Sequence, residues 1–226
     1  MIRTPVFALV VVLALGSAAG AAPIFFGPTA YVSTADIPAG LYAGGSPTAL
    51  ENFEDGSLDF GITASIGAPF GPGRSTDSVD EDDGSIDGSG LRGHSYLASG
   101  GGAPSVTFTF ASTVTAAGIV WTDGFGNVTF EAFGPGMVSL GGIGPVQLIV
   151  SSTQGNTAED RFFGVSDLNG IVAIRMASGG GGLEVDHLQF GSAVGPEPIP
   201  EPATLALVGA AFGFAAWRLR RRRTAE

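Results

Sequence analysis

The sequence predicts an all-β body, an antiparallel β-sandwich of the jelly-roll type. Between residues 22 and 194, short runs of alternating apolar and polar residues recur, separated by Gly, Pro, Asn and Asp, and helical spacing is nearly absent. The 226-residue chain contains 37 glycines and 14 prolines, as expected for many turns. Its hydrophobic content of 44% is enough for a buried core. A β-barrel is the structural alternative.

The predicted strands follow one another at short intervals. The clearest is 105–110, SVTFTF, which places Val106, Phe108 and Phe110 on one face and threonines on the other. Further strands are predicted over 116–133, with a turn at 123–127, over 145–152, and over 170–190, with a glycine loop at 179–182. No cysteine is present, so the body must rely on its core or on a metal ion instead of disulfides.

Residues 1–21 have the pattern of a secretory signal peptide. Arg3 supplies a positive start, residues 6–15 are apolar, and small residues at 17–22 provide cleavage positions. The alternative is an N-terminal membrane anchor, but the apolar run is about half the roughly 20 residues that a span needs. We therefore expect an exported protein whose body comprises residues 22–194.

The C-terminal end is organised in three parts. Residues 195–202 form a linker rich in Pro and Glu, residues 203–219 form a short predicted transmembrane helix, and residues 220–226 form a basic cytoplasmic tail. The arginines that would stop translocation are Arg218, Arg220, Arg221, Arg222 and Arg223. The chain has no lysine, so these account for half of its ten basic residues. The body is therefore strongly acidic, which argues against nucleic acid as a partner.

This ending resembles the PEP-CTERM protein-sorting signal of Gram-negative bacteria. The matching residues are Pro200, Glu201 and Pro202, then the apolar run 203–217, then RLRRRR at 218–223. The resemblance implies that an exosortase, a membrane protease, recognises the Pro-Glu-Pro motif. It also implies a transient single-pass anchor in the inner membrane, followed by delivery to the cell surface or the extracellular polysaccharide matrix.

An acidic segment at 75–90, STDSVDEDDGSIDGSG, is the first candidate metal site. Asp80, Asp83 and Asp87 are its candidate ligands, because closely spaced carboxylates repel one another unless a cation neutralises them, and calcium binds oxygen ligands. The spacing departs from the EF-hand pattern. The alternative is a solvated acidic loop.

Glu54 and Asp186 form the second candidate site, from segments far apart in the chain. The early Phe-Glu-Asp at 53–55 and the late strand LEVDHLQF at 183–190 make the body resemble jelly-roll carbohydrate-binding and lectin-like domains. In that class the first and last strands are neighbours, and an acidic residue from each can hold a structural calcium. The resemblance implies a body that binds extracellular polysaccharide with calcium. The alternative is that both acids lie on exposed faces of edge strands.

We expect no enzymatic activity. GHSYL at 93–97 is a near miss to the nucleophile elbow G-x-S-x-G around Ser95, without the surrounding alternation of strands and helices. The chain has two histidines, and no cluster suited to zinc and no phosphate-binding loop. Two alternatives stay open: a secreted glycoside hydrolase that uses a pair of carboxylates, and a purely structural matrix component.

Overall fold

The computed structural model describes residues 21–80, 90–99, 102–148 and 159–195, together with Gly209, Ala211 and Phe212. The chain divides into two compact units, Met1–Ala193 and Val194–Glu226. In the described part of the first unit, helical structure is limited to three short 3-10 helices, η1 (Thr34–Asp36), η2 (Ala43–Gly45) and η3 (Pro135–Met137), and to the single 3-10 residue Glu159. The prediction of an all-β body is confirmed.

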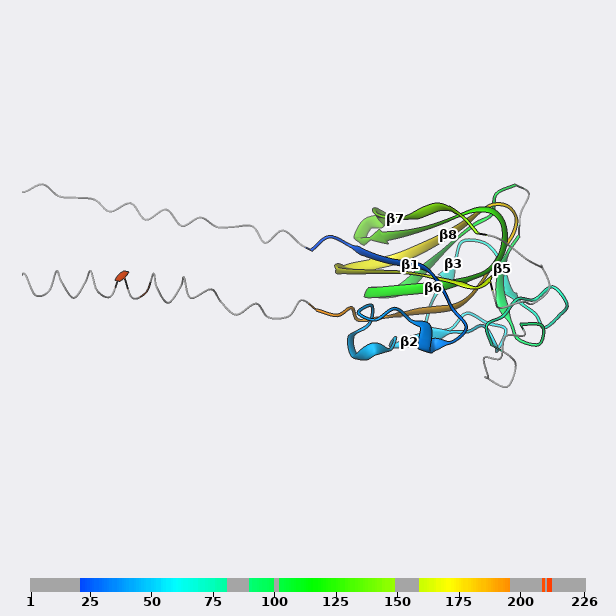
Figure 1. Ribbon diagram of the computed structural model, residues 1–226, viewed down its shortest axis with the longest axis horizontal. Helices are drawn as coiled ribbons and strands as arrows, with labels where there is room; N and C mark the ends of the chain where they lie inside the picture. Colours follow the sequence, from blue (N-terminus) through cyan, green and yellow to red (C-terminus); the bar gives the residue numbers. More distant parts are fainter. Residues whose placement is uncertain are drawn as a thin grey trace, which may run out of the picture. The chain divides into compact units, whose positions relative to one another are not determined.

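Eight strands in the described residues join in one antiparallel sheet (Figure 1). They are β1 (Ile24–Ala30), β2 (Ala49–Glu51), β3 (Thr63–Ala64), β4 (Ala68–Phe70), β5 (Ser95–Ala98), β6 (Ser105–Gly134), β7 (Val138–Gln147) and β8 (Arg161–Gly191). The two long strands β6 and β8 organise the sheet, because β3 and β7 pair with β6, whereas β1, β2 and β5 pair with β8.

The pairing of β6 with β8 falls into two sets. In the first set, residues 173–178 of β8 pair with 105–109 of β6 and also with 128–133 of β6. A strand has two edges, so this part of β8 lies between two parts of β6. The predicted strands over 105–110 and around the Phe130 region therefore become neighbours of the same central strand.

The second set reverses the roles of the two strands. Residues 116–121 of β6 pair with 161–166 of β8 and also with 185–191 of β8. The two long strands therefore interleave twice, and the sheet curls into a sandwich-like body with apolar residues enclosed between its parts. The jelly-roll connectivity expected from the sequence stays a prediction.

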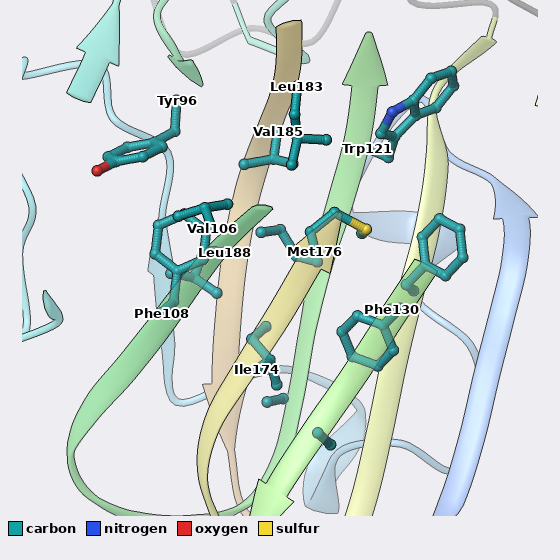
Figure 2. Packing of buried hydrophobic residues seen from close by; sticks show 14 of the residues in the cluster. Tyr96, Val106, Phe108, Trp121, Phe130, Ile174, Met176, Leu183, Val185 and Leu188 are labelled. Carbon is teal, nitrogen blue, oxygen red and sulfur yellow. The ribbon is translucent and has the colours of Figure 1, made fainter. Parts of the chain in front are cut away.

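The main core fills the inside of this curled sheet. Val106, Phe108 and Phe110 are buried there, as their alternation with threonines predicts. Figure 2 shows Met176 near the middle of the cluster, with Phe108 to one side and Phe130 to the other. Because these side chains come from both long strands, burial of the core holds the interleaved pairing together.

A second, smaller core lies on the face of β6 that points away from the main core around Val120. Ile119 and Trp121 point into the main core, whereas Val120, between them, belongs to the second core. The second core comprises Tyr31, Leu41, Tyr42, Val79, Ala116, Val120, Phe162 and Ala193. The part of β6 around Val120 is therefore buried on both of its faces. A polar side chain in this part of β6, or in the parts of β8 that pair with it, is thus removed from water.

Several predicted elements have different bounds in the structure, and the two strands expected over 170–190 lie within the single strand β8 (Arg161–Gly191), which includes the glycines at 179–182. The turn expected at 123–127 lies within β6, where the register changes between Phe125 and Val128 and Gly126 adopts a φ of 84°. This glycine allows the strand to bend without the steric strain that a Cβ would cause. β7 ends at Gln147, earlier than the strand expected over 145–152, and residues 149–158 lie outside the described part of the chain.

The predicted signal peptide at 1–21 and the predicted helix at 203–219 fall almost entirely on residues that the structure does not describe. Gly209, Ala211 and Phe212 have helical backbone. Within the described residues, no helix is both long and apolar enough to cross a membrane.

Candidate functional site

The structure brings together Glu54, Asp80 and Asp186 from three distant segments. Ser78 Oγ lies 3.3 Å from Glu54 Oε1 and 3.0 Å from Asp186 Oδ2, and it is 2.8 Å from the carbonyl oxygen of Asp80. The N–H of Val79 donates to Asp186 Oδ2 at 2.8 Å. Glu54 and Asp186 therefore approach the same hydroxyl group, and their role as calcium ligands stays a prediction. Asp83 and Asp87 lie outside the described residues.

Strand pairing explains why these segments meet. β2 pairs with the end of β8, with Glu51 opposite Leu188, so the chain that follows β2 arrives beside Asp186. Gly93 then lets the segment around Ser78 approach, because a Cβ at this position would lie 2.5 Å from Ser78 Oγ and 2.7 Å from Glu54 Oε1. Such distances are far below van der Waals contact, so the close approach depends on glycine.

Protein groups already hydrogen-bond each acid of this first group, although burial still raises the pKa of Asp186 to about 7 despite the neighbouring His187. The N–H of His94 donates to Glu54 Oε1 at 2.7 Å. Asp80 Oδ2 lies 2.9 Å from His187 Nε2 in an ion pair and accepts a hydrogen bond from Asn52 at 3.0 Å. Burial alone would raise the pKa of Asp80, but His187 and Asn52 outweigh it and hold the pKa below its ordinary value.

His187 is held at a bulge in β8. Asp186 lies opposite Val120 and Gln189 opposite Gly118, so three steps along β8 match two along β6. His187 adopts a φ of 43°, which is uncommon for a residue other than glycine, and Tyr31 Oη lies 2.9 Å from its Nδ1. The bulge places the ring of His187 in the interior beside Asp80.

A second group of buried acids lies beside the first. This acidic cluster consists of Asp77, Asp123, Glu159, Asp160 and Glu184, all of them buried. Glu184 Oε1 accepts a hydrogen bond from the N–H of Asp77 at 2.7 Å and another from the hydroxyl of Ser95. In contrast, neither carboxylate oxygen of Asp77 or of Asp160 has a hydrogen-bond partner among the described residues.

Burial and mutual repulsion raise the pKa values in the acidic cluster. Burial, with added repulsion from Glu184 and Asp123, raises the pKa of Asp77 to about 9. Burial also raises the pKa of Glu184 to about 7, although the hydrogen bonds from Asp77 and Ser95 oppose it. The pKa of Asp160 lies well above its ordinary value, chiefly because of burial and then because of Asp77. In each case burial disfavours the charged form more than neighbouring hydrogen bonds and positive charge favour it.

A small open pocket exposes one edge of the acidic cluster. It contains about 200 Å³ of empty space, including solvent at its mouth. Its lining residues are Leu97, Asp123, Gly124, Phe125, Gly182 and Glu184. Phe125 is 54% exposed, although it is a large aromatic residue. The pocket therefore combines an exposed ring with two carboxylates, which is an arrangement suited to a polar ligand with a flat apolar face.

The residues of GHSYL, the near miss to a nucleophile elbow, form no triad in the described part of the chain. Ser95 donates to Glu184, while His94 pairs with Glu54 and His187 with Asp80. Among the described residues, no group of three or more His, Cys, Asp or Glu side chains stands in an arrangement that could hold a metal ion.

Sequence reasoning missed most of the acidic cluster. Asp77 lies within the acidic segment 75–90, whose composition is typical of a solvated loop, and no local pattern singles out Asp123, Glu159 or Asp160. One signal was available for Glu184: it alternates with Leu183 and Val185 on a strand, so burial of both faces would bury its carboxylate.

The C-terminal sorting signal is the part of the chain with a known counterpart. Residues 198–222 match the model of the PEP-CTERM protein-sorting motif. The chain carries a PEP-CTERM sorting motif. The matched range contains Pro200, Glu201 and Pro202, and of the predicted stop-transfer arginines it contains all except Arg223. No curated protein and no solved structure matches the chain.

The PEP-CTERM motif indicates how the chain is exported and sorted. It marks the chain as an exported protein that undergoes membrane-associated sorting, through exosortase, to the cell surface. Pro200, Glu201 and Pro202 lie outside the described part of the structure. Since the match covers only the C-terminal end, the role of the body must be argued from its own geometry.

Proposed function

We propose that this protein is a non-enzymatic component of the cell surface or extracellular matrix, whose jelly-roll body binds extracellular polysaccharide with calcium as a structural ion. The observation that carries the proposal is the match of residues 198–222 to the PEP-CTERM motif, which directs the body to the place where polysaccharide is found. The pocket beside Phe125 supplies a candidate ligand site. In this proposal the segment 203–219 is a transient single-pass anchor in the inner membrane until exosortase acts.

Replacing Glu201 with alanine should stop sorting. The change removes the charged centre of the Pro-Glu-Pro motif, so the chain should keep its C-terminal segment and accumulate in the inner membrane. Fractionation followed by intact mass measurement checks this result. Glu197→Ala is the matched control, since Glu197 occupies the earlier Pro-Glu-Pro and lies outside the matched range. Normal surface delivery and normal processing of the Glu201→Ala chain would contradict the prediction.

The pocket supports polysaccharide as the ligand of the body. A sugar ring offers an apolar face that packs on an aromatic ring and hydroxyl groups that donate to carboxylates. Phe125 supplies the exposed ring, and Asp123 and Glu184 supply acceptors in the same pocket. The small volume favours contact with one or two sugar units at the surface over enclosure of a long chain.

Replacing Phe125 with alanine should weaken polysaccharide binding by about tenfold, which corresponds to roughly 1.4 kcal/mol. Stability should change by less than about 0.5 kcal/mol, because the ring is largely exposed. The measurement is titration with exopolysaccharide from the producing cells. Phe60→Ala is the control, because Phe60 is 53% exposed and does not line the pocket. Equal weakening by both variants would argue against the pocket as the binding site.

A glycoside hydrolase is the second candidate, and the pocket is the observation that favours it. Asp123 and Glu184 lie in one pocket, and burial raises the pKa of Glu184 to about 7, which suits a general acid. Release of reducing ends from polysaccharide, abolished by Glu184→Gln, would favour this candidate. Binding without any release of reducing ends would favour the non-enzymatic body.

A further inference from the structure

The acidic cluster contains five buried carboxyl groups, and those of Asp77 and Asp160 have no hydrogen-bond partner among the described residues. His187 is engaged by Asp80 in an ion pair at 2.9 Å. Arg161 donates through Nη1 to the backbone carbonyl of Asp160 at 2.7 Å, and its charge does not outweigh the burial that raises the pKa of Asp160. Buried carboxylates without compensation are costly, so they are expected either to take up protons or to bind a cation.

Strand pairing draws the cluster together around β6. Trp121 lies opposite Arg161 on one side and opposite Val185 on the other. Asp160 immediately precedes Arg161, and Glu184 immediately precedes Val185, so their carboxylates flank the same short stretch of β6. Asp123 lies directly opposite Glu184 in the register. Like charges directly opposite each other destabilise a sheet unless something neutralises them.

Asp77 and Asp160 provide the observation that points to a ligand. Both side chains are 0% exposed, and all four of their carboxylate oxygens lack a hydrogen-bond partner among the described residues. The two carboxylates are near enough to interact, since the charge of Asp77 contributes to the raised pKa of Asp160. The backbone of Asp77 is in turn anchored to Glu184 through the 2.7 Å hydrogen bond from its N–H. These groups therefore share one interior region.

We propose that Asp77, Asp160 and Glu184 hold a divalent cation behind the pocket, with calcium as the preferred ion. The ligand atoms are all oxygen, which selects hard cations over zinc or copper. Bidentate carboxylates let three residues supply most of the six to eight oxygens that calcium takes, and the open pocket lets water supply the rest. Binding requires these side chains to rotate toward one another, because the carboxylates as they stand do not form a group that could hold a metal ion.

This site differs from the one that the sequence suggested. The carboxylates of Glu54, Asp80 and Asp186 already accept hydrogen bonds from protein groups, whereas Asp77 and Asp160 have none among the described residues. The inference rests on the calcium part of the proposed function and does not depend on polysaccharide binding.

Calorimetry of the full chain in mild detergent tests the inference. A hundredfold excess of calcium over Kd should raise the Tm by roughly 5 to 10 °C relative to chelator. In Asp77→Asn and in Asp160→Asn this shift should disappear. Both variants should be at least as stable as the wild type in chelator, because each replaces a buried carboxyl group that has no hydrogen-bond partner and keeps the side-chain shape.

Asp80→Asn is the matched control. Asp80 is also a buried aspartate, but its charge is paired with His187. The variant should therefore have a lower Tm in both conditions and should keep the calcium shift. If the calcium-induced rise in Tm persists in both Asp77→Asn and Asp160→Asn, the chain binds calcium elsewhere and the proposed site is wrong. If calcium does not raise the Tm of the wild type, both the proposed site and the calcium part of the proposed function are wrong. Polysaccharide binding is then tested separately by titration.

Terbium luminescence locates the ion in the unaltered chain if a variant fails to fold. Terbium replaces calcium at oxygen sites and emits when a nearby tryptophan is excited. The chain has two tryptophans, and Trp121 lies beside the proposed site. Sensitised emission that calcium displaces, and that Trp121→Phe removes, would support the site. Emission that Trp121→Phe leaves unchanged would overturn it.

Discussion

Replacing His187 with asparagine is expected to lower the free energy of unfolding by about 3 to 5 kcal/mol. His187 is 1% exposed, and its Nε2 forms a 2.9 Å ion pair with Asp80. The change leaves the buried carboxylate of Asp80 without its charged partner and removes the edge contact between His187 and Tyr31. Asparagine is chosen because it tolerates the positive φ of this position better than most residues. Urea unfolding of the full chain measures the loss.

The other histidine provides the control. His94 pairs with Glu54 at 3.4 Å, and both side chains are partly exposed. Exposed or half-exposed pairs contribute little, so His94→Asn should cost less than about 1 kcal/mol. If both variants lost the same free energy of unfolding, the buried ion pair would contribute no more to stability than the partly exposed pair.

The contribution of His187 should also depend on pH. Burial lowers the pKa of His187, but Asp80, Asp186 and Glu54 outweigh it and raise the pKa, while Tyr31 Oη faces the other ring nitrogen. A raised pKa means that the folded state binds the proton more tightly than the unfolded state. The stabilisation is therefore complete below about pH 6.5 and is lost as the pH rises through the folded-state pKa. As the pH increases through the folded-state pKa of His187, the difference in free energy of unfolding between wild type and His187→Asn should become smaller.

Replacing Gly93 with alanine is the second change with a large expected effect. The added Cβ would press against the carbonyl oxygen of Asp80 and would lie 2.5 Å from Ser78 Oγ and 2.7 Å from Glu54 Oε1. A backbone carbonyl cannot rotate away as a side chain can, so the segment around Ser78 must move. We expect a loss of about 3 kcal/mol, at the upper end of the cost of overpacking. The midpoint of urea unfolding at an unchanged m-value measures this loss.

Gly180→Ala is the matched control for Gly93→Ala. A Cβ at Gly180 meets no atom within 4 Å, so this alanine should be neutral or stabilise the chain by up to about 1 kcal/mol through the unfolded state. If Gly93→Ala behaved like Gly180→Ala, the close packing of the segment around Ser78 on Glu54 would be refuted.

The strand content could be predicted because the pattern is local. Val106, Phe108 and Phe110 alternate with threonines, and this alternation alone determines which face is buried. The meeting of Glu54 with Asp186 was also predictable, since it needed only that early and late strands be neighbours. Both expectations concern one strand or one pair of strands.

The acidic cluster could not be predicted in the same way. Its members are brought together by the register between β6 and β8, in which residue 123 meets residue 184, and by the return of Asp77 to the interior. No local pattern encodes a register between residues about sixty positions apart. Asp77 also lies in a run that continues into many acids, so its composition is typical of a solvated loop, although the residue is buried.

The most direct test of the account is a crystal structure of the chain grown with calcium, with an anomalous difference map to locate the ion. The account predicts one strong peak with carboxylate oxygens of Asp77, Asp160 and Glu184 about 2.3 to 2.6 Å away. A peak among Glu54, Asp80 and Asp186 would place the ion where the sequence first suggested and would contradict the site proposed here. A map without any peak in the body, at calcium concentrations of several millimolar, would contradict a calcium-stabilised body altogether.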